Sequence, residues 1–378
     1  MSEFVPGLAG VVAARSAISF INGTEGVLSY RGIRIEELAA RSTFEEVCYL
    51  LIDGALPTRT QLAAFDAELR GLREVPAGIF TMLRALPKDT HPMVALQAAS
   101  AAMGGFYPHL DVSDRAGNRL AALRLTACLP GIVAGFDRIR RGLEPLADKA
   151  ELSHAANFLW LLNGEVPDAQ ETRILDLCLV LHAEHGFNAS TFTGRVVASA
   201  LANPYAVVSA AVGTLSGPLH GGANEEVLTM LRTIDAVADV PAFLQGRIDN
   251  KQKIMGLGHR VYKVKDPRAG LLQELAAALF AEKGSTPLYD IAEALEGEAK
   301  VKLGGKGIYP NVDFYSGLVY DKLGFATDLF TPIFAVSRVS GWTAHWLEQL
   351  EDNRIYRPTQ QYVGLTNVSY TDIDSRGA

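Results

Sequence analysis

Apolar residues recur at intervals of three and four along most of the chain, the spacing that places side chains on one face of an α-helix. In residues 42–51, Ser42 and Glu45 have the spacing of a capping box at the start of such a helix. The same periodicity predicts further helices in residues 57–72, 91–103, 120–136, 152–162, 171–183, 207–215, 224–231, 269–280, 316–323 and 333–350. Alternating apolar and polar residues are best developed in residues 16–30, where Asn22–Gly23 predicts the turn of a short hairpin. The pattern therefore predicts an all-α fold.

Loops rich in glycine, or in proline and glycine, are concentrated in the second half of the chain. They occupy residues 216–223, 256–259, 266–268 and 304–311. These loops interrupt helices and lie close to His, Asp, Lys and Arg side chains, which is typical of functional sites rather than of plain connections. We therefore expect the chemistry of the protein to lie there.

Composition excludes several classes of protein. The 35 basic and 42 acidic residues give a formal charge of −7, which argues against nucleic acid or an anionic membrane as the main partner. An apolar share of 48% in 378 residues can form a large core. The three cysteines, Cys48, Cys128 and Cys178, lie in apolar segments and favour a reducing compartment. No stretch reaches the roughly 18 uncharged apolar residues of a membrane span, so we expect a cytoplasmic protein.

Three histidines lie beside glycine: His185 in HAEHGFNAS, His220 in GPLHGGANE and His259 in GLGHRVYKVKDPR. Glycine allows a backbone or a substrate to approach a neighbouring polar side chain closely. A single histidine is more often a satisfied core or surface imidazole. Three histidines that each lie beside glycine favour a functional site.

A metal site has weaker support. His182 and His185 are three residues apart with Glu184 between them, so a helix could place both imidazoles on one face. No third ligand is indicated, and neither a cysteine pair nor an HExxH motif occurs. We therefore expect no metal.

Asp313, in YPNVDFYSG, is a carboxylate among aromatic and apolar neighbours. Such surroundings raise a carboxyl pKa and make it a usable base near neutral pH. An aspartate before an apolar run is also a common helix N-cap. Both interpretations remain open at the level of the sequence.

Three arginines, Arg268 in DPRAG, Arg338 in AVSRVSG and Arg357 in IYRPTQ, lie near proline, glycine or serine. Guanidinium groups bind carboxylates through paired hydrogen bonds, so several together suit a di- or tricarboxylate, although each alone could form a surface salt bridge. Lys306 in LGGKGIYP lacks the Ser/Thr and the glycine spacing of a P-loop, and no GxGxxG opens a βαβ unit.

Four segments, HAEHGFNASTFT, GPLHGGANE, IMGLGHRVYKVKDPRA and GIYPNVDFYSG, follow one another in the order found in citrate synthases. The chain resembles this family over nearly its whole length, from GLAGVVAARSAISFINGTEGVLSYRG to IYRPTQQYVG. Its length resembles the short bacterial and archaeal type.

The resemblance implies an all-α fold with two domains. The large domain would comprise residues 1–221 and 325–378, form the dimer and provide the oxaloacetate side. The small domain, residues 222–324, would provide the CoA side with His259 and Asp313, and the glycine-rich loops would line the cleft or hinge between them. The implied unit is a homodimer in which Arg357 enters the active site of the partner.

The implied activity is that of an acyltransferase that condenses acetyl-CoA with oxaloacetate and hydrolyses citryl-CoA, the first step of the tricarboxylic acid cycle. Acetyl-CoA is a substrate, and no cofactor is expected. Asp313 would be the base, His220 would stabilise the enolate and His259 would polarise the ketone. The implied oxaloacetate ligands are His185, Arg268, Arg338 and Arg357. The implied CoA contacts are Ile254, Gly256, Gly258, Lys263 and Lys306.

Two alternatives accompany this interpretation. A 2-methylcitrate synthase would use propionyl-CoA with the same fold and catalytic residues, because one methylene changes specificity by only about 1–3 kcal/mol. A non-enzymatic helical protein would bind a metal or another ligand through His182, Glu184 and His185.

Overall fold

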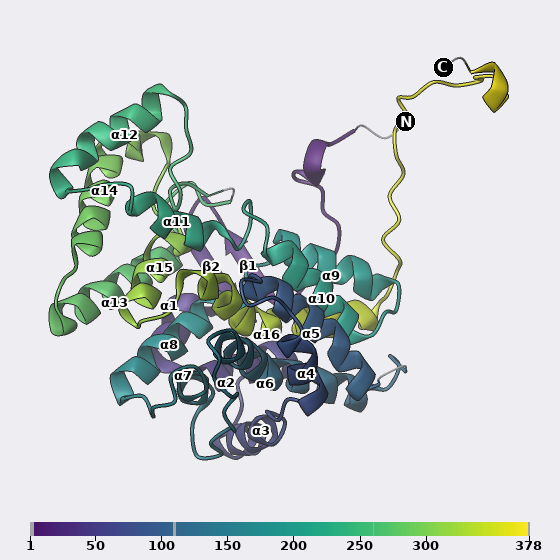
Figure 1. The fold of residues 1–378 in the computed structure, drawn as a ribbon, viewed down its shortest axis with the longest axis horizontal. Helices are drawn as coiled ribbons and strands as arrows, with labels where there is room; N and C mark the ends of the chain where they lie inside the picture. Colours follow the sequence, from purple (N-terminus) through teal and green to yellow (C-terminus); the bar gives the residue numbers. More distant parts are fainter. Residues whose placement is uncertain (1–3, 109–110, 260, 377–378) are drawn as a thin grey trace.

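The computed structural model describes residues 4–108, 111–259 and 261–376, and helices dominate them (Figure 1). The first ten α-helices are α1 (Ile35–Arg41), α2 (Phe44–Asp53), α3 (Arg59–Gly71), α4 (Ala77–Arg84), α5 (Pro92–Phe106), α6 (Arg115–Arg140), α7 (His154–Asn163), α8 (Ala169–His182), α9 (Ala189–Ser199) and α10 (Pro204–Leu215). The others are α11 (Ala223–Leu231), α12 (Val240–Asp249), α13 (Pro267–Lys283), α14 (Pro287–Leu303), α15 (Val312–Lys322) and α16 (Phe330–Glu351). Short 3₁₀ turns are η1 (Pro6–Leu8), η2 (Val237–Asp239), η3 (Gly304–Lys306), η4 (Thr327–Leu329) and η5 (Ile373–Ser375). The predicted all-α class is confirmed.

The predicted hairpin is present as part of a small antiparallel sheet. It consists of β1 (Ser19–Asn22), β2 (Val27–Tyr30) and β3 (Ile33–Arg34), in that order. The Asn22–Gly23 turn differs from the expectation, because Asn22 pairs with Val27 and four residues lie between them. The Asn22 side-chain oxygen accepts hydrogen bonds from two backbone N–H groups of the turn, each at 3.1 Å. That side-chain contact stabilises the longer loop.

The predicted capping box at Ser42 is wrong by one residue. Thr43 is the N-cap of α2, and its hydroxyl accepts from the Glu46 N–H at 3.3 Å. Glu45 is buried and accepts a 2.7 Å hydrogen bond from the His154 N–H. Capping by Thr43 leaves Glu45 free to make this tertiary contact, which local sequence does not reveal.

Two long helices, α6 and α16, form the centre of the core. Helix α16 packs against α2, α6, α8, α9 and α10. By length and composition alone α6 could cross a membrane, but 83% of its most apolar window is buried inside the protein. This burial is that of a core helix.

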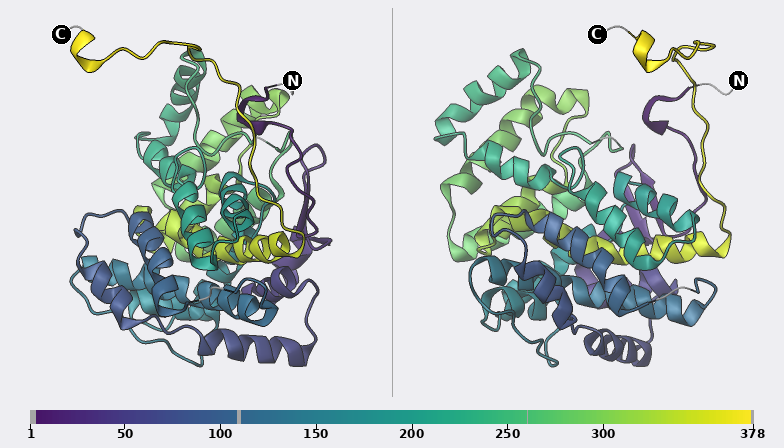
Figure 2. Two further views of the ribbon diagram at one scale, coloured as in Figure 1. Left: turned by 90° about the vertical axis from the view of Figure 1, so that its right-hand side faces the viewer. Right: turned by 45° about the vertical axis from the view of Figure 1, so that its right-hand side comes forward.

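Helices α11–α15 lie together beside the remaining helices (Figures 1 and 2). Within this group α15 packs against α11 and α13, and α12 packs against α14. Helix α16 then returns the chain to the other helices. The division into domains at residues 222 and 324 stays a prediction.

Both ends of the described chain leave the helical body as extended segments, and the segment that follows α16 reaches farthest (Figure 2). They carry large apolar side chains in solvent. Val12 is 86% exposed, Val363 89% and Tyr370 80%. An apolar surface of this kind is typical of segments that contact another protein chain.

Candidate active site

A cavity of about 1130 Å³ brings the glycine-rich loops together. Its lining comes from the segments 7–13, 185–192, 218–223, 253–259 and 311–313, together with Ile21, Val261, Arg268, Phe334 and Arg338. Small-molecule sites usually measure roughly 300–1000 Å³, so this cavity can hold a large ligand. Most of the residues singled out in the sequence line it: His185, His220, Ile254, Gly256, Gly258, His259, Arg268, Asp313 and Arg338.

Backbone hydrogen bonds join the loop before His259 to the loop before Asp313. The Gly258 N–H donates to the Tyr309 carbonyl at 2.8 Å, and the Asn311 N–H donates to the Gly256 carbonyl at 2.9 Å. Gly256 has φ of +78°, and a Cβ there would contact the side chains of its packed neighbours. Glycine is therefore required where the two loops meet.

The β1–β2 turn supports the chain beyond His259. The Lys263 N–H donates to the Gly23 carbonyl at 2.8 Å. A Cβ on Gly23 would collide with the Val261 carbonyl group. The N-terminal hairpin therefore packs directly on the loop that carries His259.

His259 is a neutral imidazole whose tautomer is set by the backbone. Its Nδ1 accepts hydrogen bonds from the N–H groups of Val261 at 3.0 Å and Tyr262 at 3.1 Å. Burial, with Arg268 adding to it, lowers the pKa of His259 to about 4. Since Nδ1 must accept, the proton lies on Nε2, which can donate to a ligand.

His220 has the opposite tautomer for the same kind of reason. Its Nε2 lies 3.3 Å from the Ser190 N–H, which donates to it, and 2.9 Å from the Ser190 hydroxyl. Burial and the charge of Arg338 lower its pKa to about 4. The proton of neutral His220 therefore lies on Nδ1.

Two buried arginines give the cavity positive charge. Arg268 and Arg338 are 2% and 1% exposed. Arg268 donates from Nε and one terminal nitrogen to Asp266 at 3.1 and 2.7 Å, whereas Arg338 donates from Nε to the His182 carbonyl at 2.6 Å. Burial lowers the pKa of Arg338 to about 10, so it stays charged at neutral pH. Glu184 acts on Arg338 through its charge, but no carboxylate of the described residues forms an ion pair with Arg338, so this guanidinium can bind a substrate carboxylate.

Asp313 is not the N-cap of its helix, so that interpretation of the sequence is wrong. Asn311 is the N-cap of α15, and its side chain accepts from the Asp313 N–H at 3.0 Å. The Asp313 Oδ1 atom is buried without a hydrogen-bond partner among the described residues. Burial raises the Asp313 pKa to about 7, against the opposing effect of Arg268. A carboxylate in this state can accept a proton at neutral pH.

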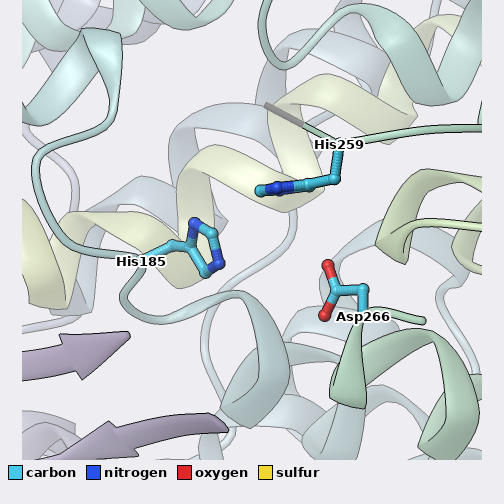
Figure 3. Close-up of side chains that lie close together, drawn as sticks. All are labelled: His185, His259 and Asp266. Carbon is cyan, nitrogen blue, oxygen red and sulfur yellow. The ribbon is translucent and has the colours of Figure 1, made fainter. Parts of the chain in front are cut away.

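Side chains of metal-binding types converge at one place among the described residues. Figure 3 shows His185, His259 and Asp266 close together. One possible ligand atom from each lies within 4.8 Å of the others. Asp266 is already hydrogen-bonded to Arg268 through both carboxylate oxygens, and that guanidinium would repel a cation. Asp266 is therefore neutralised by Arg268 and is a poor ligand for a metal ion.

The metal group considered from the sequence does not assemble. His182 hydrogen-bonds through Nδ1 to the Cys178 carbonyl at 2.8 Å. Glu184 accepts from the Ser19 hydroxyl at 2.9 Å and contacts His345 Nε2 at 3.0 Å. His182 and Glu184 thus have structural partners, and only His185 reaches the cavity.

Three of the expected site residues lie outside the cavity lining. Lys263 and Lys306 are exposed on neighbouring loops, where a Cβ on Gly307 would lie 3.0 Å from the Lys263 carbonyl oxygen. Arg357 is exposed in the extended segment after α16.

Sequence reasoning missed several polar residues of the site, among them Asn188, Ser190, Lys253, Tyr262 and Asp266. Asn188 and Asp266 cap α9 and α13, and both precede helices in polar, capping-type contexts that a search for N-caps could have found. Tyr262 and Ser190 contact His185 and His220, which are distant in the sequence, and no local sequence pattern indicates these contacts.

This chain is similar to citrate synthases in sequence and in fold. The family profile described as "Citrate synthase, C-terminal domain" matches residues 7–359. A citrate synthase from Synechocystis sp. is 54% identical over 99% of this chain and 94% of its own length. A 2-methylcitrate synthase from Shewanella oneidensis is less similar, at 39% identity over 95% of each chain. The ternary complex of carboxymethyl coenzyme A and oxaloacetate with citrate synthase from Thermoplasma acidophilum superposes with a TM-score of 0.95, at 32% identity and full coverage of both chains.

Proposed function

Because this chain belongs to the citrate synthase family, we propose that its cavity condenses acetyl-CoA with oxaloacetate and water to give citrate and CoA. The observation that carries this proposal is Asp313, a half-buried residue whose Oδ1 atom is fully buried and whose pKa is about 7, in one cavity with neutral imidazoles and two arginines. Such a carboxylate can remove a weakly acidic methyl proton near neutral pH. The reaction is an acyl transfer in which the acyl group becomes an alkyl group.

Oxaloacetate would bind on the arginine side of the cavity. Arg338 and the terminal nitrogen of Arg268 that has no hydrogen-bond partner among the described residues offer donors for its carboxylates, and His185 lies beside them. His259 would donate from Nε2 to the ketone oxygen, polarise the carbonyl and later protonate the alkoxide. Holding these groups in place before reaction converts a collision between two substrates into an oriented step.

Acetyl-CoA would be activated between Asp313 and His220. Asp313 takes a proton from the methyl group while the Nδ1–H of His220 donates to the thioester oxygen, where negative charge develops. The resulting enolate carbon bonds to the ketone carbon of oxaloacetate and forms citryl-CoA. Water then attacks the thioester carbonyl, and CoA leaves as the thiol. Neutral histidine donors suit this role because they stabilise the oxyanion without requiring a protonated imidazole.

The remainder of CoA would lie along the loops that precede His259 and Asp313. We propose the backbone of Ile254, Gly256 and Gly258 as the adenine contact, since these residues line the cavity. Lys263 and Lys306 lie on adjacent exposed loops and offer positive charge to the CoA phosphates. Acetyl-CoA is thus a substrate, and this scheme uses no resident cofactor.

We propose that residues 222–324 form a small domain that closes over the cavity against residues 1–221 and 325–378. His259 and Asp313 belong to the first unit, whereas His185 and Arg338 belong to the second. A bound substrate touching both would favour closure and exclude water before condensation.

We also propose a homodimer with shared active sites, in the cytoplasm. The extended end segments expose apolar residues that a second copy would cover. Arg357 lies in one of these segments, away from the cavity of its own chain. A second copy could therefore receive it as an additional oxaloacetate ligand.

Replacing His220 with alanine should lower kcat by about 10²–10³, because a lost oxyanion donor typically costs that much. Steady-state kinetics with varied acetyl-CoA will separate kcat from KM. Unchanged oxaloacetate binding, measured by calorimetry, will show that the cavity is intact. A variant that only raises the KM for acetyl-CoA would make His220 a binding residue.

The proposed activity is tested by product analysis on the purified protein. Incubation with oxaloacetate and acetyl-CoA should release free thiol and citrate in equal amounts, with neither formed when oxaloacetate is omitted. Thiol release without citrate would show a thioesterase and would overturn the proposal.

A further inference from the structure

We propose, on the basis of the proposed function, that the Tyr262 hydroxyl is a positioning group which sets the tautomer of His185 and thereby directs its Nδ1–H toward oxaloacetate. Tyr262 lies three residues after His259 and is 1% exposed. Its hydroxyl oxygen is 3.1 Å from His185 Nε2. The inference concerns a residue that contacts the binding histidine but does not itself line the cavity.

Tyr262 contacts two cavity histidines in different ways. Its backbone N–H donates to His259 Nδ1, and its ring lies 4.7 Å from the His259 ring between centroids. Its side chain reaches His185, whose ring centroid is 5.6 Å away. The two imidazoles are themselves 5.3 Å apart. Tyr262 therefore contacts a ring nitrogen of both histidines, through its backbone N–H at His259 and through its hydroxyl at His185.

The charges around Tyr262 decide the direction of its hydrogen bond. Arg268 has the largest charge effect on the phenol and exceeds the opposing effect of Asp266, with which it is paired, and a cation attracts the oxygen lone pairs. The O–H then points away from Arg268, toward His185 Nε2. Burial raises the pKa of Tyr262 and lowers that of His185, so the phenol keeps its proton and the imidazole is neutral at pH 7.

An Nε2 atom that accepts leaves the proton of neutral His185 on Nδ1. Nδ1 has no hydrogen-bond partner among the described residues, and it is not one of their fully buried unpartnered atoms. His185 lines the cavity, so its Nδ1 is open to a ligand there. A carboxylate oxygen needs a donor at this position, and the other tautomer would present a lone pair.

All three cavity histidines then have a tautomer set by a protein donor. Backbone N–H groups set His220 and His259, whereas a side chain sets His185. The donor to His185 can therefore be removed by a single substitution. Phenylalanine at position 262 would keep the ring and its packing but leave the Nε2 atom without a donor.

The test is Tyr262→Phe, with Tyr289→Phe as the matched control. Tyr289 is a buried tyrosine of α14 whose hydroxyl bonds to Glu293 at 2.8 Å, so its loss removes a hydroxyl outside the cavity. We expect Tyr262→Phe to raise the KM for oxaloacetate about tenfold, equivalent to about 1.4 kcal/mol, with kcat changed less than about twofold. The control should change neither constant.

Nitrogen-15 NMR of histidine-labelled protein gives a readout that packing alone would not move. The His185 signals, assigned by their loss in His185→Ala, should show Nδ1–H in the wild type and a mixture of tautomers in Tyr262→Phe. In the His185→Ala background, Tyr262→Phe should add no further rise in KM.

Unchanged His185 shifts in Tyr262→Phe would overturn the proposal. So would a fall in kcat with an unchanged KM for oxaloacetate, which would show that the ring only supports the His259 loop. If the wild-type protein did not act on oxaloacetate, the proposed function would fail, while the NMR comparison would still decide the tautomer.

Discussion

Replacing Asp313 with asparagine is expected to lower kcat by about 10²–10⁴, the usual loss when a general base is removed. Asparagine has nearly the same shape, and its side chain fits the same place at the start of α15. It cannot take a proton from the methyl group of acetyl-CoA. Oxaloacetate binding should remain, because the arginines that would hold its carboxylates are unchanged.

The pH dependence supplies a second measurement of the same role. Burial raises the Asp313 pKa to about 7, so the carboxylate form is present above that pH and is lost below it. The kcat of the wild type should therefore fall as the pH decreases through about 7. The remaining rate of Asp313→Asn should lack this decrease, because the titrating group is absent.

The control is Asp321→Asn, near the other end of α15. Asp321 forms a partly exposed pair with Arg232 at 2.8 Å and lies outside the cavity lining. Its replacement should leave kcat unchanged. An Asp313→Asn enzyme that keeps more than about a tenth of the wild-type kcat would remove Asp313 from the role of base.

Mixing two inactive variants, Arg357→Ala and Asp313→Asn, should restore about a quarter of the wild-type activity. In a mixed dimer, one active site receives both substitutions and the other receives neither if Arg357 comes from the second copy. About half of the dimers are mixed after random exchange, and half of their sites are intact. Activity should rise as subunits exchange, which mass spectrometry can follow.

A second mixture provides the matched control. His259→Ala and Asp313→Asn both alter residues that one chain contributes to its own cavity. Every site of their mixed dimer carries one substitution, so no activity should return. If the Arg357 mixture behaved in the same way after confirmed exchange, Arg357 would serve its own subunit and the shared site would be rejected.

Most long helices could be predicted from the sequence because their apolar residues cover one face. Residues 120–136 lie within α6, and residues 333–350 lie within α16. Helix α14 was not predicted from its apolar pattern, although Thr286 at its N-cap and Pro287 at its first position mark its start. Helices with weak amphipathic patterns are recognised better by their ends than by their faces.

The identities of the cavity residues could be predicted from glycine-flanked motifs, whereas the way they are held could not. Asp313 shows the limit, since both a base and an N-cap fitted the sequence, and only the structure shows that Asn311 is the cap. Ser190 and Tyr262 reach His220 and His185 from positions 30 and 77 residues away in the chain. Such contacts depend on how helices and loops pack, and short-range patterns do not contain them.

The central claim is that this cavity uses acetyl-CoA, and it is tested most directly by measuring kcat/KM for acetyl-CoA and propionyl-CoA side by side, with oxaloacetate as the second substrate. One additional methylene typically changes specificity by about 10–200-fold, which this comparison resolves easily. We predict a higher kcat/KM for acetyl-CoA, with citrate as its product. A higher kcat/KM for propionyl-CoA, with 2-methylcitrate as the product, would contradict the account.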